Sequence, residues 1–169
     1  TNYSKEKIFL QHKLMDIKSK YNIKFGWLRI FAPFGKYEKK ESLIYKLLKS
    51  TIYSIPCDCI HSERKRDYIY IDDIIEIINL MINKQFNGDL NGGNGNNKNI
   101  YDLIGLFKNV FDREPLINWV KNQILEDSKL FNSSWVSYPE KLFNSLPEYK
   151  PTSLKEGLII YSKELNQKS

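Results

Sequence analysis

The sequence predicts an α/β protein with a parallel β-sheet. Residues 3–20 combine scattered apolar side chains with many Lys, Glu and Gln, and a largely apolar, strand-like run follows at residues 23–31. A second strand-like run, at residues 68–71, leads directly into another helical stretch at residues 73–83. Since neighbouring parallel strands are joined through a crossover that is usually a helix, this alternation favours a parallel sheet.

Length and composition fit one globular unit spanning residues 1–169. With 41% hydrophobic and 27% charged residues, the chain can bury a real core and is too polar for a membrane protein. No apolar run approaches the roughly 18 residues that a membrane-spanning helix needs, and residues 1–7 lack the hydrophobic core of a secretion signal. We therefore expect a cytoplasmic protein with no membrane contact.

The first two elements are predicted to be an amphipathic helix and a buried strand. The run at residues 23–31 has the continuous apolar character of a strand covered on both faces, and Pro33 and Gly35 end it. In residues 3–20, apolar side chains lie among polar ones in the pattern of an amphipathic helix. They are Ile8, Leu14, Met15 and Ile17.

Residues 42–52 predict a second helix, ahead of the strand and helix at residues 68–83. Asp73 stands at the predicted N-cap of the helix over residues 73–83, where its carboxylate can accept a hydrogen bond from the first turn. Glu76 follows three residues later, as a capping box requires. These are ordinary folding signals rather than signs of chemistry.

Asn99 and Ser153 each begin a further predicted helix, and Glu156 gives Ser153 the reciprocal acid of a capping box. Residues 91–97 contain only Asn and Gly, which favours a turn. The pattern lacks the third glycine of a phosphate-binding loop, because Lys98 stands at that position. Phosphate binding by this turn is the weaker alternative.

The positive charge of the chain leaves several classes of partner open. The 26 Lys and Arg against 20 Asp and Glu give +6, which fits nucleic acid, an anionic surface or an anionic small substrate. The basic residues are scattered except at residues 61–66, where an acid interrupts them. A solvated surface explains this distribution as well as nucleic acid does, so no nucleic-acid partner is expected.

The cysteines and histidines do not predict a metal or redox site. Cys57 and Cys59 are separated by one residue, unlike a C-x-x-C motif, and belong to no four-ligand set. With His12 and His61 as its only histidines, the chain is unsuited to a site built on paired imidazoles. We expect two reduced thiols with a structural role and no metal.

Tyr3 and Lys7 form the first pair with a clear chemical use. Four residues apart on a helix, their phenol and ammonium groups share one face. A nearby positive charge stabilises the phenolate, which can exchange a proton with a substrate hydroxyl or carbonyl. Taken alone this pattern is weak, because a chain with 11 Tyr and many Lys produces it by chance.

The order of the motifs behind Tyr3 is more specific than the pair itself. Residues 28–35 read Leu-Arg-x-Phe-x-x-x-Gly, and residues 66–73 read Arg-Asp-Tyr-x-x-Ile-x-Asp, before the glycine-bearing turn. In this order the motifs resemble the extended short-chain dehydrogenase/reductase family, from its active-site tyrosine to its C-terminus. Its members are NAD(P)-dependent epimerases, dehydratases and reductases of nucleotide sugars.

This resemblance implies a partial Rossmann-type fold with a small α/β substrate-binding subdomain. It makes Tyr3 the general acid/base, and Lys7 the residue that favours its ionised form and hydrogen-bonds the nicotinamide ribose. Ala32, Pro33 and Phe34 would lie along the nicotinamide of NAD or NADP. Members of the family usually have Asn where Ala32 stands, so one amide that helps to hold the substrate is replaced.

The implied substrate is a nucleotide-diphosphate sugar. Leu43 and Ile44 occupy the stretch that runs under the nucleotide base in the family, although helix packing explains them equally well. Arg66 would grip the diphosphate with its guanidinium fork, the alternative being a surface ion pair beside Asp67. The family often has a second diphosphate-binding arginine, and Lys121 is the nearest cation to that position.

The resemblance favours a reductase or epimerase of deoxysugar nucleotides, acting by hydride transfer. Gly35 and Glu38 match a Tyr/Phe-Gly-Pro-x-Glu segment of 4-keto-6-deoxysugar reductases, whereas Lys36 replaces its proline. Asp67 and Asp73 are expected to be structural, Asp67 through local hydrogen bonds and Asp73 through the helix cap.

The glycine-rich dinucleotide loop of the family, its ribose-reading acid and its catalytic Ser/Thr all precede the tyrosine and have no counterpart in this sequence. We therefore expect the chain by itself to bind NAD weakly or not at all, as a fragment, one part of a split enzyme or a truncated relic. A non-catalytic module that holds a nucleotide sugar or a partner chain is the alternative. The helix at residues 3–20 is also a candidate homodimer interface, as it is in the family.

Overall fold

The computed structural model describes residues 2–121 and 134–166. The predicted α/β class is confirmed, and helices alternate with short strands along the chain. The helices are α1 Asn2–Tyr21, α2 Leu43–Tyr53, α3 Ile71–Asn83, α4 Ile100–Phe111, α6 Glu140–Ser145 and α7 Leu154–Asn166. The strands are β1 Gly26–Ile30, β2 Ala32–Phe34, β3 Cys57–Cys59, β4 Arg66–Tyr70, β5 Gly88–Gly92, β6 Asn97–Lys98 and β7 Ile117–Trp119.

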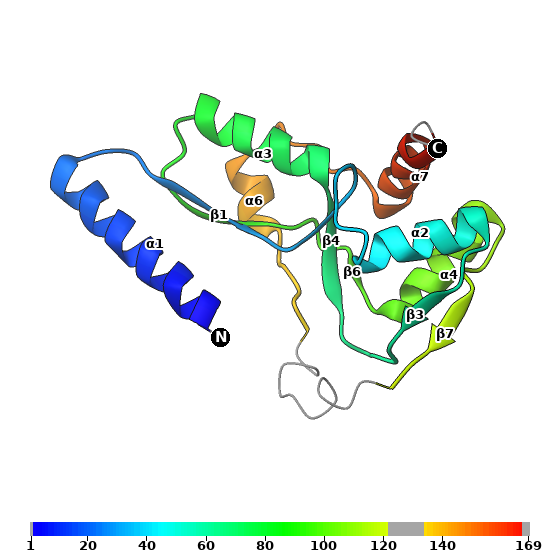
Figure 1. The fold of residues 1–169 in the computed structure, drawn as a ribbon. Helices are drawn as coiled ribbons and strands as arrows, with labels where there is room; N and C mark the ends of the chain where they lie inside the picture. The colour runs from blue at the N-terminus through cyan, green and yellow to red at the C-terminus, as the bar shows by residue number, and fades with distance from the viewer. Residues whose placement is uncertain (1, 122–133, 167–169) are drawn as a thin grey trace.

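The described strands pair mainly in parallel, as predicted. β1 pairs with β5, β2 with β4, and β3 with β7, all in parallel, whereas β6 joins the other edge of β4 antiparallel. Figure 1 shows β4 between two groups of helices, with α3 and α6 on one side and α2, α4 and α7 on the other. None of the described helices is both long and apolar enough to cross a membrane.

Strand β4 separates two hydrophobic cores. Side chains alternate along a strand, so Tyr68 and Tyr70 point to one face and Ile69 to the other. Tyr68 and Tyr70 belong to the core that α2, α4 and α7 share, and Ile69 belongs to the core between α3, α6 and β5. All three side chains are buried. The strand is therefore packed on both faces, and this packing determines the position at which its first residue, Arg66, reaches the protein surface.

Helix α1 and strand β1 are less buried than their sequence predicts. None of the residues of α1 is buried, and Phe9 on this helix is 63% exposed. The predicted buried strand over residues 23–31 is wrong in extent and in burial, because regular pairing covers only β1, whose residues are half-buried or exposed. Only β5 pairs with β1 among the described strands, which leaves the other edge of β1 open.

The predicted starts of α4 and α7 are confirmed. Asn99 accepts a hydrogen bond from the Asp102 backbone N–H at 2.9 Å, and the Asp102 carboxylate accepts one from the Asn99 N–H at 3.0 Å. Ser153 and Glu156 make the same reciprocal pair in front of α7. Both capping boxes satisfy backbone donors that would otherwise lack partners at the helix ends.

Asp73 has a different role from the predicted helix cap. Helix α3 begins two residues earlier, with Tyr70 as an N-cap that makes no side-chain cap bond. The buried Asp73 carboxylate instead accepts hydrogen bonds from Thr152, through its N–H at 3.0 Å and its Oγ1 at 2.6 Å. Asn94 Nδ2 donates at 2.8 Å, and Tyr149 Oη lies 3.1 Å away. Asp73 thus ties α3 to the Asn-rich turn and to the segment before α7.

The Asn- and Gly-rich turn at residues 91–97 is packed into the protein rather than forming a surface hairpin. Asp67 accepts hydrogen bonds from the backbone N–H groups of Gly95 at 3.0 Å and Asn96 at 2.9 Å. The expectation of local hydrogen bonds for Asp67 is therefore wrong, because its partners are distant in sequence. A Cβ atom at Gly93 would collide with the Asp67 carboxylate, which explains the need for glycine there.

We predict that Asp73→Ala lowers the free energy of unfolding by about 3 kcal/mol, because several buried donors lose their acceptor together. Asp72→Ala is the matched control, since Asp72 is exposed on the same helix turn. That control should cost no more than about 1 kcal/mol through the helix dipole. Urea denaturation followed by circular dichroism measures both values, and equal losses would contradict the role assigned to Asp73.

Candidate functional site

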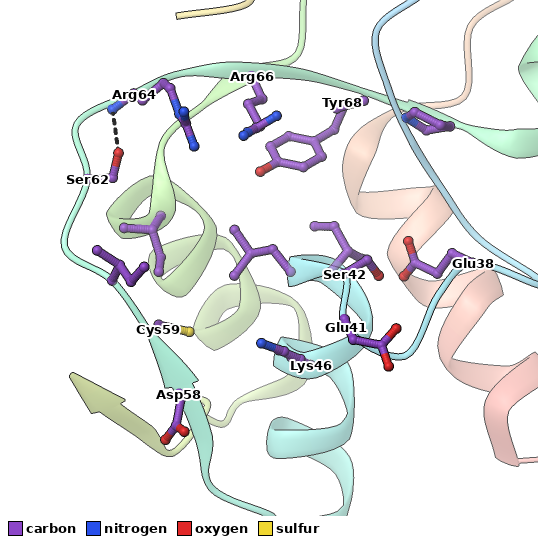
Figure 2. A pocket seen from close by; sticks show the side chains of 16 residues that line it. Glu38, Glu41, Ser42, Lys46, Asp58, Cys59, Ser62, Arg64, Arg66 and Tyr68 are labelled. Carbon is purple, nitrogen blue, oxygen red and sulfur yellow. Dashed lines mark hydrogen bonds between the residues drawn. The ribbon is translucent and has the colours of Figure 1, made fainter. Parts of the chain in front are cut away.

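A cavity of about 490 Å³ opens between α2, β3 and the start of β4, and Figure 2 shows the side chains around it. We call it the α2–β4 cavity. One wall is formed by β2 with the loop and first turn of α2, a second by β3 and the residue after it, and a third by the segment that leads into β4. Ile100, the first residue of α4, completes the lining.

The α2–β4 cavity brings together residues that were assigned to cofactor or substrate from sequence alone. Ala32 and Pro33 line it from β2, Leu43 and Ile44 from the first turn of α2, and Arg66 from the start of β4. The parallel pairing of β2 with β4, in which Ala32 lies opposite Tyr68, brings these distant segments side by side. Ile44 is only 2% exposed, so it serves the hydrophobic core as well as the cavity.

Phe34 and Lys121 do not belong to this cavity. The Phe34 side chain is 2% exposed and packs against the Tyr70 ring, with the ring centroids 5.6 Å apart. Its side chain therefore contributes to the core, and its expected contact with the nicotinamide stays a prediction. Lys121 is exposed and is not part of the cavity lining, and its expected contact with the diphosphate stays a prediction.

Tyr3 and Lys7 lie on α1, outside the α2–β4 cavity. The Lys7 ammonium is 5.5 Å from the centroid of the Tyr3 ring, so the two residues share a helix face as their spacing predicts. Tyr3 is 68% exposed, and Figure 1 shows α1 standing apart from the other helices. The described part of the chain thus presents the Tyr3–Lys7 pair and the cavity on separate elements.

The segment leading into β4 supplies two of the three cationic side chains that line the cavity, and Lys46 of α2 supplies the third. Arg66 and Arg64 both line the cavity, and the Arg66 guanidinium lies 4.9 Å from the centroid of the Trp135 ring. Desolvation by burial raises the pKa of Tyr68 to about 12, although the charges of Arg66 and Arg64 act in the opposite direction. Tyr68 is therefore a neutral hydrogen-bonding group beside two cations at neutral pH.

Glu38 and Ser42 bring polar atoms into the wall between β2 and α2. Glu38 Oε1 and Ser42 Oγ are buried, and neither makes a hydrogen bond of good geometry within the described residues, although Ser42 and Tyr161 lie close to the Glu38 carboxylate. Desolvation by burial raises the pKa of Glu38 to about 7, with Ser42 and Tyr161 offsetting part of the shift. Two buried polar atoms without a well-formed hydrogen bond beside a cavity are suited to binding hydroxyl groups of a ligand.

The cysteines have no catalytic features. Cys57 and Cys59 are free, buried thiols on β3, with their sulfur atoms 3.9 Å apart. Desolvation raises the pKa of Cys59 to about 12, so its reactive thiolate form is scarce at neutral pH. Within the described residues, no group of His, Cys, Asp or Glu is arranged to hold a metal ion.

Sequence reasoning missed Arg64 and the burial of Glu38. The Arg-Lys-Arg sequence of residues 64–66 could have indicated Arg64, because side chains two residues apart on an extended segment point to the same face. Once Arg66 is assigned to a ligand, Arg64 is therefore its natural companion. The burial of Glu38 carried no local signal, since it depends on Tyr161 from the distant helix α7.

Comparison with known proteins identifies the family of this chain. The sequence profile of the NAD dependent epimerase/dehydratase family matches residues 1–94, more than half of the chain. The chain belongs to this family, and the resemblance to extended short-chain dehydrogenases/reductases is confirmed. The family is NAD-dependent.

Individual relatives are similar to this chain but longer than it. The dTDP-4-dehydro-6-deoxyglucose reductase of Escherichia coli is 28% identical over 123 residues, which cover 70% of this chain and 39% of the relative. In fold, the chain is similar to a UDP-N-acetylglucosamine 4-epimerase from Methanobrevibacter ruminantium M1 in complex with UDP-N-acetylmuramic acid. The TM-score is 0.82 at 18% identity, covering 99% of this chain and 54% of that one.

A second similar solved structure is a complex that contains NAD. The UDP-glucuronic acid 4-epimerase of Bacillus cereus, in complex with UDP-glucuronic acid and NAD, has a TM-score of 0.71 at 22% identity. The similarity covers 94% of this chain and 50% of that one. This chain therefore spans about half the length of the solved structures and less than half of the curated relative. The Rossmann-type fold class is shown by these structures.

We predict that Glu38→Gln stabilises the protein at pH 8 and has little effect near pH 4. The folded-state pKa of about 7 lies above the ordinary glutamate pKa of 4.5, so the native state holds the proton more tightly. Stability contributed by this group therefore falls as pH rises from about 4.5 to about 7, and glutamine removes that loss. The gain at pH 8 should be roughly 1–2 kcal/mol after allowance for solvent screening.

Urea denaturation at pH 4, 6 and 8 measures this effect, and Glu41→Gln is the control because Glu41 lines the same cavity but is exposed. A gain for Glu38→Gln that does not change with pH would contradict the burial of this carboxyl group.

Proposed function

We propose that this chain supplies the nucleotide-sugar-binding part and the proton-transfer tyrosine of an NAD(P)-dependent epimerase, dehydratase or 4-keto-6-deoxysugar reductase. The observation that carries the proposal is the composition of the α2–β4 cavity. Ala32, Pro33, Leu43, Ile44 and Arg66 come from three separate segments, and all of them line this one space. Because the chain belongs to an NAD-dependent family, we assign these residues to the binding of one nucleotide sugar.

The cavity offers suitable chemistry for each part of a nucleotide sugar. The Arg66 guanidinium can donate paired hydrogen bonds to diphosphate oxygens, and its stacking on Trp135 orients it. Leu43 and Ile44 offer an apolar surface for the flat face of a base. The buried oxygen of Glu38 can accept a hydrogen bond from a sugar hydroxyl, in place of the amide that the family usually has at position 32.

Tyr3 and Lys7 fit the nicotinamide end of a dinucleotide. Their side chains share one face of α1, and the exposed phenol is accessible to a ligand. NAD(P), when bound, supplies a hydride acceptor or donor for a sugar carbon. Tyr3 Oη would take the proton from the oxygen on that carbon, or return it, while the Lys7 ammonium stabilises the phenolate. We find no residues in this chain for the adenosine end.

We propose that the dinucleotide-binding part of the family domain completes the site by packing against α1 and the open edge of β1. Apolar side chains are exposed on both elements, including Phe9 and Met15 on α1 and Ile30 on β1. An apolar groove with Leu28 and Met81 in its lining runs between β1 and α3. The spacing of parallel strands allows a further strand to add at the free edge. A homodimer through α1 is the competing use of the same surface.

The choice among reactions rests on the relatives. Similarity to the dTDP-4-dehydro-6-deoxyglucose reductase favours reduction of a 4-keto-6-deoxysugar nucleotide, whereas the similar solved structures favour epimerisation. In both reactions the chain would handle a proton at Tyr3 Oη. A cytoplasmic location and the choice between NAD and NADP stay predictions.

The proposal is tested in the full product of the reading frame that contains this chain, and in the chain mixed with a separately produced dinucleotide-binding half. NAD(P)H absorbance and sugar products are followed with dTDP-4-dehydro-6-deoxyglucose, UDP-glucose and UDP-glucuronic acid as substrates. Turnover of a nucleotide sugar supports the proposal. Absence of turnover in both preparations, with the dinucleotide bound, would contradict it.

We predict that Tyr3→Phe lowers kcat by a factor of about 10²–10⁴, the usual contribution of a general acid/base, and leaves dinucleotide affinity nearly unchanged. Tyr21→Phe is the matched control, because Tyr21 is an exposed tyrosine at the other end of α1. The control should keep its activity. Equal activity of Tyr3→Phe and wild type would remove Tyr3 from the mechanism. Lys7→Met should impair both rate and dinucleotide affinity.

A non-catalytic binding module is the second candidate, favoured by one observation. The α2–β4 cavity is formed entirely within the described chain, whereas Tyr3 lies outside it on a helix without buried residues. Such a chain could hold a nucleotide sugar without turning it over. Calorimetric titration of the isolated chain with UDP-glucose separates the two: micromolar affinity without NAD favours the module, and affinity only in the millimolar range favours one part of an enzyme.

A further inference from the structure

We propose that Arg64 is a second phosphate-binding residue, which forms with Arg66 a two-guanidinium clamp at one end of the α2–β4 cavity. The inference deepens the proposed function and rests on it, since the ligand of the clamp would be the diphosphate of a nucleotide sugar. It assigns to Arg64 the role that the sequence suggested for Lys121.

The alternation of side chains places Arg64 and Arg66 on the same side of the chain. Both line the cavity, whereas Lys65 between them does not. Lys65 is exposed, and its backbone pairs with the segment around Trp135: its N–H donates to Ser134 Oγ at 3.1 Å, and its carbonyl accepts from the Trp135 N–H at 2.9 Å. Figure 2 shows both arginine side chains extending from this segment into the cavity. The same backbone pairing therefore fixes the segment from which both arginine side chains extend.

The charges of this pair favour an anion between them. Burial lowers the pKa of Arg64, and the neighbouring charge of Arg66 lowers it further. Arg66 takes part in no ion pair among the described residues, and its guanidinium instead lies over Trp135. Two like charges in a partly buried space repel each other, and a polyanion that accepts hydrogen bonds from both relieves this repulsion.

A diphosphate matches this arrangement better than a single carboxylate does. Each guanidinium presents parallel N–H donors that suit two oxygen atoms of one phosphate group, so two arginines suit two linked phosphates. Glu38 and Glu41 lie toward the α2 side of the cavity, away from Arg64 and Arg66 (Figure 2). Lys46 and Asp58 also line the cavity and offset each other in charge, so Arg64 and Arg66 give the β4 end the larger net positive charge, which favours phosphates there.

The clamp is tested by calorimetric titration of the full chain with inorganic pyrophosphate at low ionic strength. Arg64→Gln and Arg66→Gln should each weaken binding by about tenfold or more, because each removes charge-assisted hydrogen bonds. Arg64→Lys should give an intermediate loss, since it keeps the charge without the fork. Lys65→Gln is the matched control: it removes one charge from the neighbouring position outside the cavity, and it should change affinity by no more than about twofold.

Several results would overturn the clamp. These are a wild-type chain that does not bind pyrophosphate, unchanged affinity in Arg64→Gln, or an equal loss in Lys65→Gln, which would indicate general attraction to a basic surface. Thermal unfolding of each variant shows whether it is folded, and Arg64→Lys provides the test if Arg64→Gln unfolds.

Failure of the clamp is distinguishable from failure of the proposed function. In an active complete enzyme, Arg64→Gln should raise KM for the nucleotide sugar with kcat little changed. An unchanged KM overturns the clamp while the turnover still supports the function. Conversely, pyrophosphate binding that depends on Arg64, in a protein without nucleotide-sugar turnover, keeps the anion site and contradicts the enzyme.

Discussion

The burial of β4 between two hydrophobic cores is the constraint on which the rest of the structure depends. Tyr68 and Tyr70 pack into one core and Ile69 into the other, so the strand can neither rotate nor shift register without exposing apolar side chains. Asp67, on the same strand, holds the Asn-rich turn through backbone hydrogen bonds. Because the strand is fixed in this way, Arg66 at its first position meets the cavity at a defined place.

The described chain divides into a well-packed part and an exposed part. The elements from β2 onward surround the two cores and form the α2–β4 cavity, whereas α1 and most of β1 present apolar side chains to solvent. This division matches the proposed division of labour: one part recognises the nucleotide sugar, and the other carries the proton-transfer pair to an interface. Under this proposal, the exposed edge of β1 and the exposed face of α1 form the interface with the dinucleotide-binding part.

Local sequence patterns predicted the helices and their caps well. They did not predict burial and tertiary contacts, because these depend on residues distant in sequence. The Tyr3 helix and the capping boxes follow from spacing, and the order of motifs singled out Arg66, which lines the cavity. The burial of β1 was overestimated because an apolar run does not reveal which elements cover it. Asp73 was predicted to cap a helix, but its carboxylate instead accepts a hydrogen bond from Thr152, far along the chain. The burial of the Phe34 side chain against Tyr70 likewise depends on a distant strand and carried no local signal.

The central claim is that the α2–β4 cavity binds a nucleotide sugar, and the most direct test is methyl NMR of the isoleucine-labelled chain during titration with UDP-glucose and dTDP-glucose. Ile44, Ile60 and Ile100 line this cavity, whereas Ile78 and Ile82 line the apolar groove between β1 and α3. The account predicts ligand-dependent shifts at the first three methyl groups and little change at the other two. Shifts confined to Ile78 and Ile82, or no shift at any isoleucine at millimolar ligand, would contradict it.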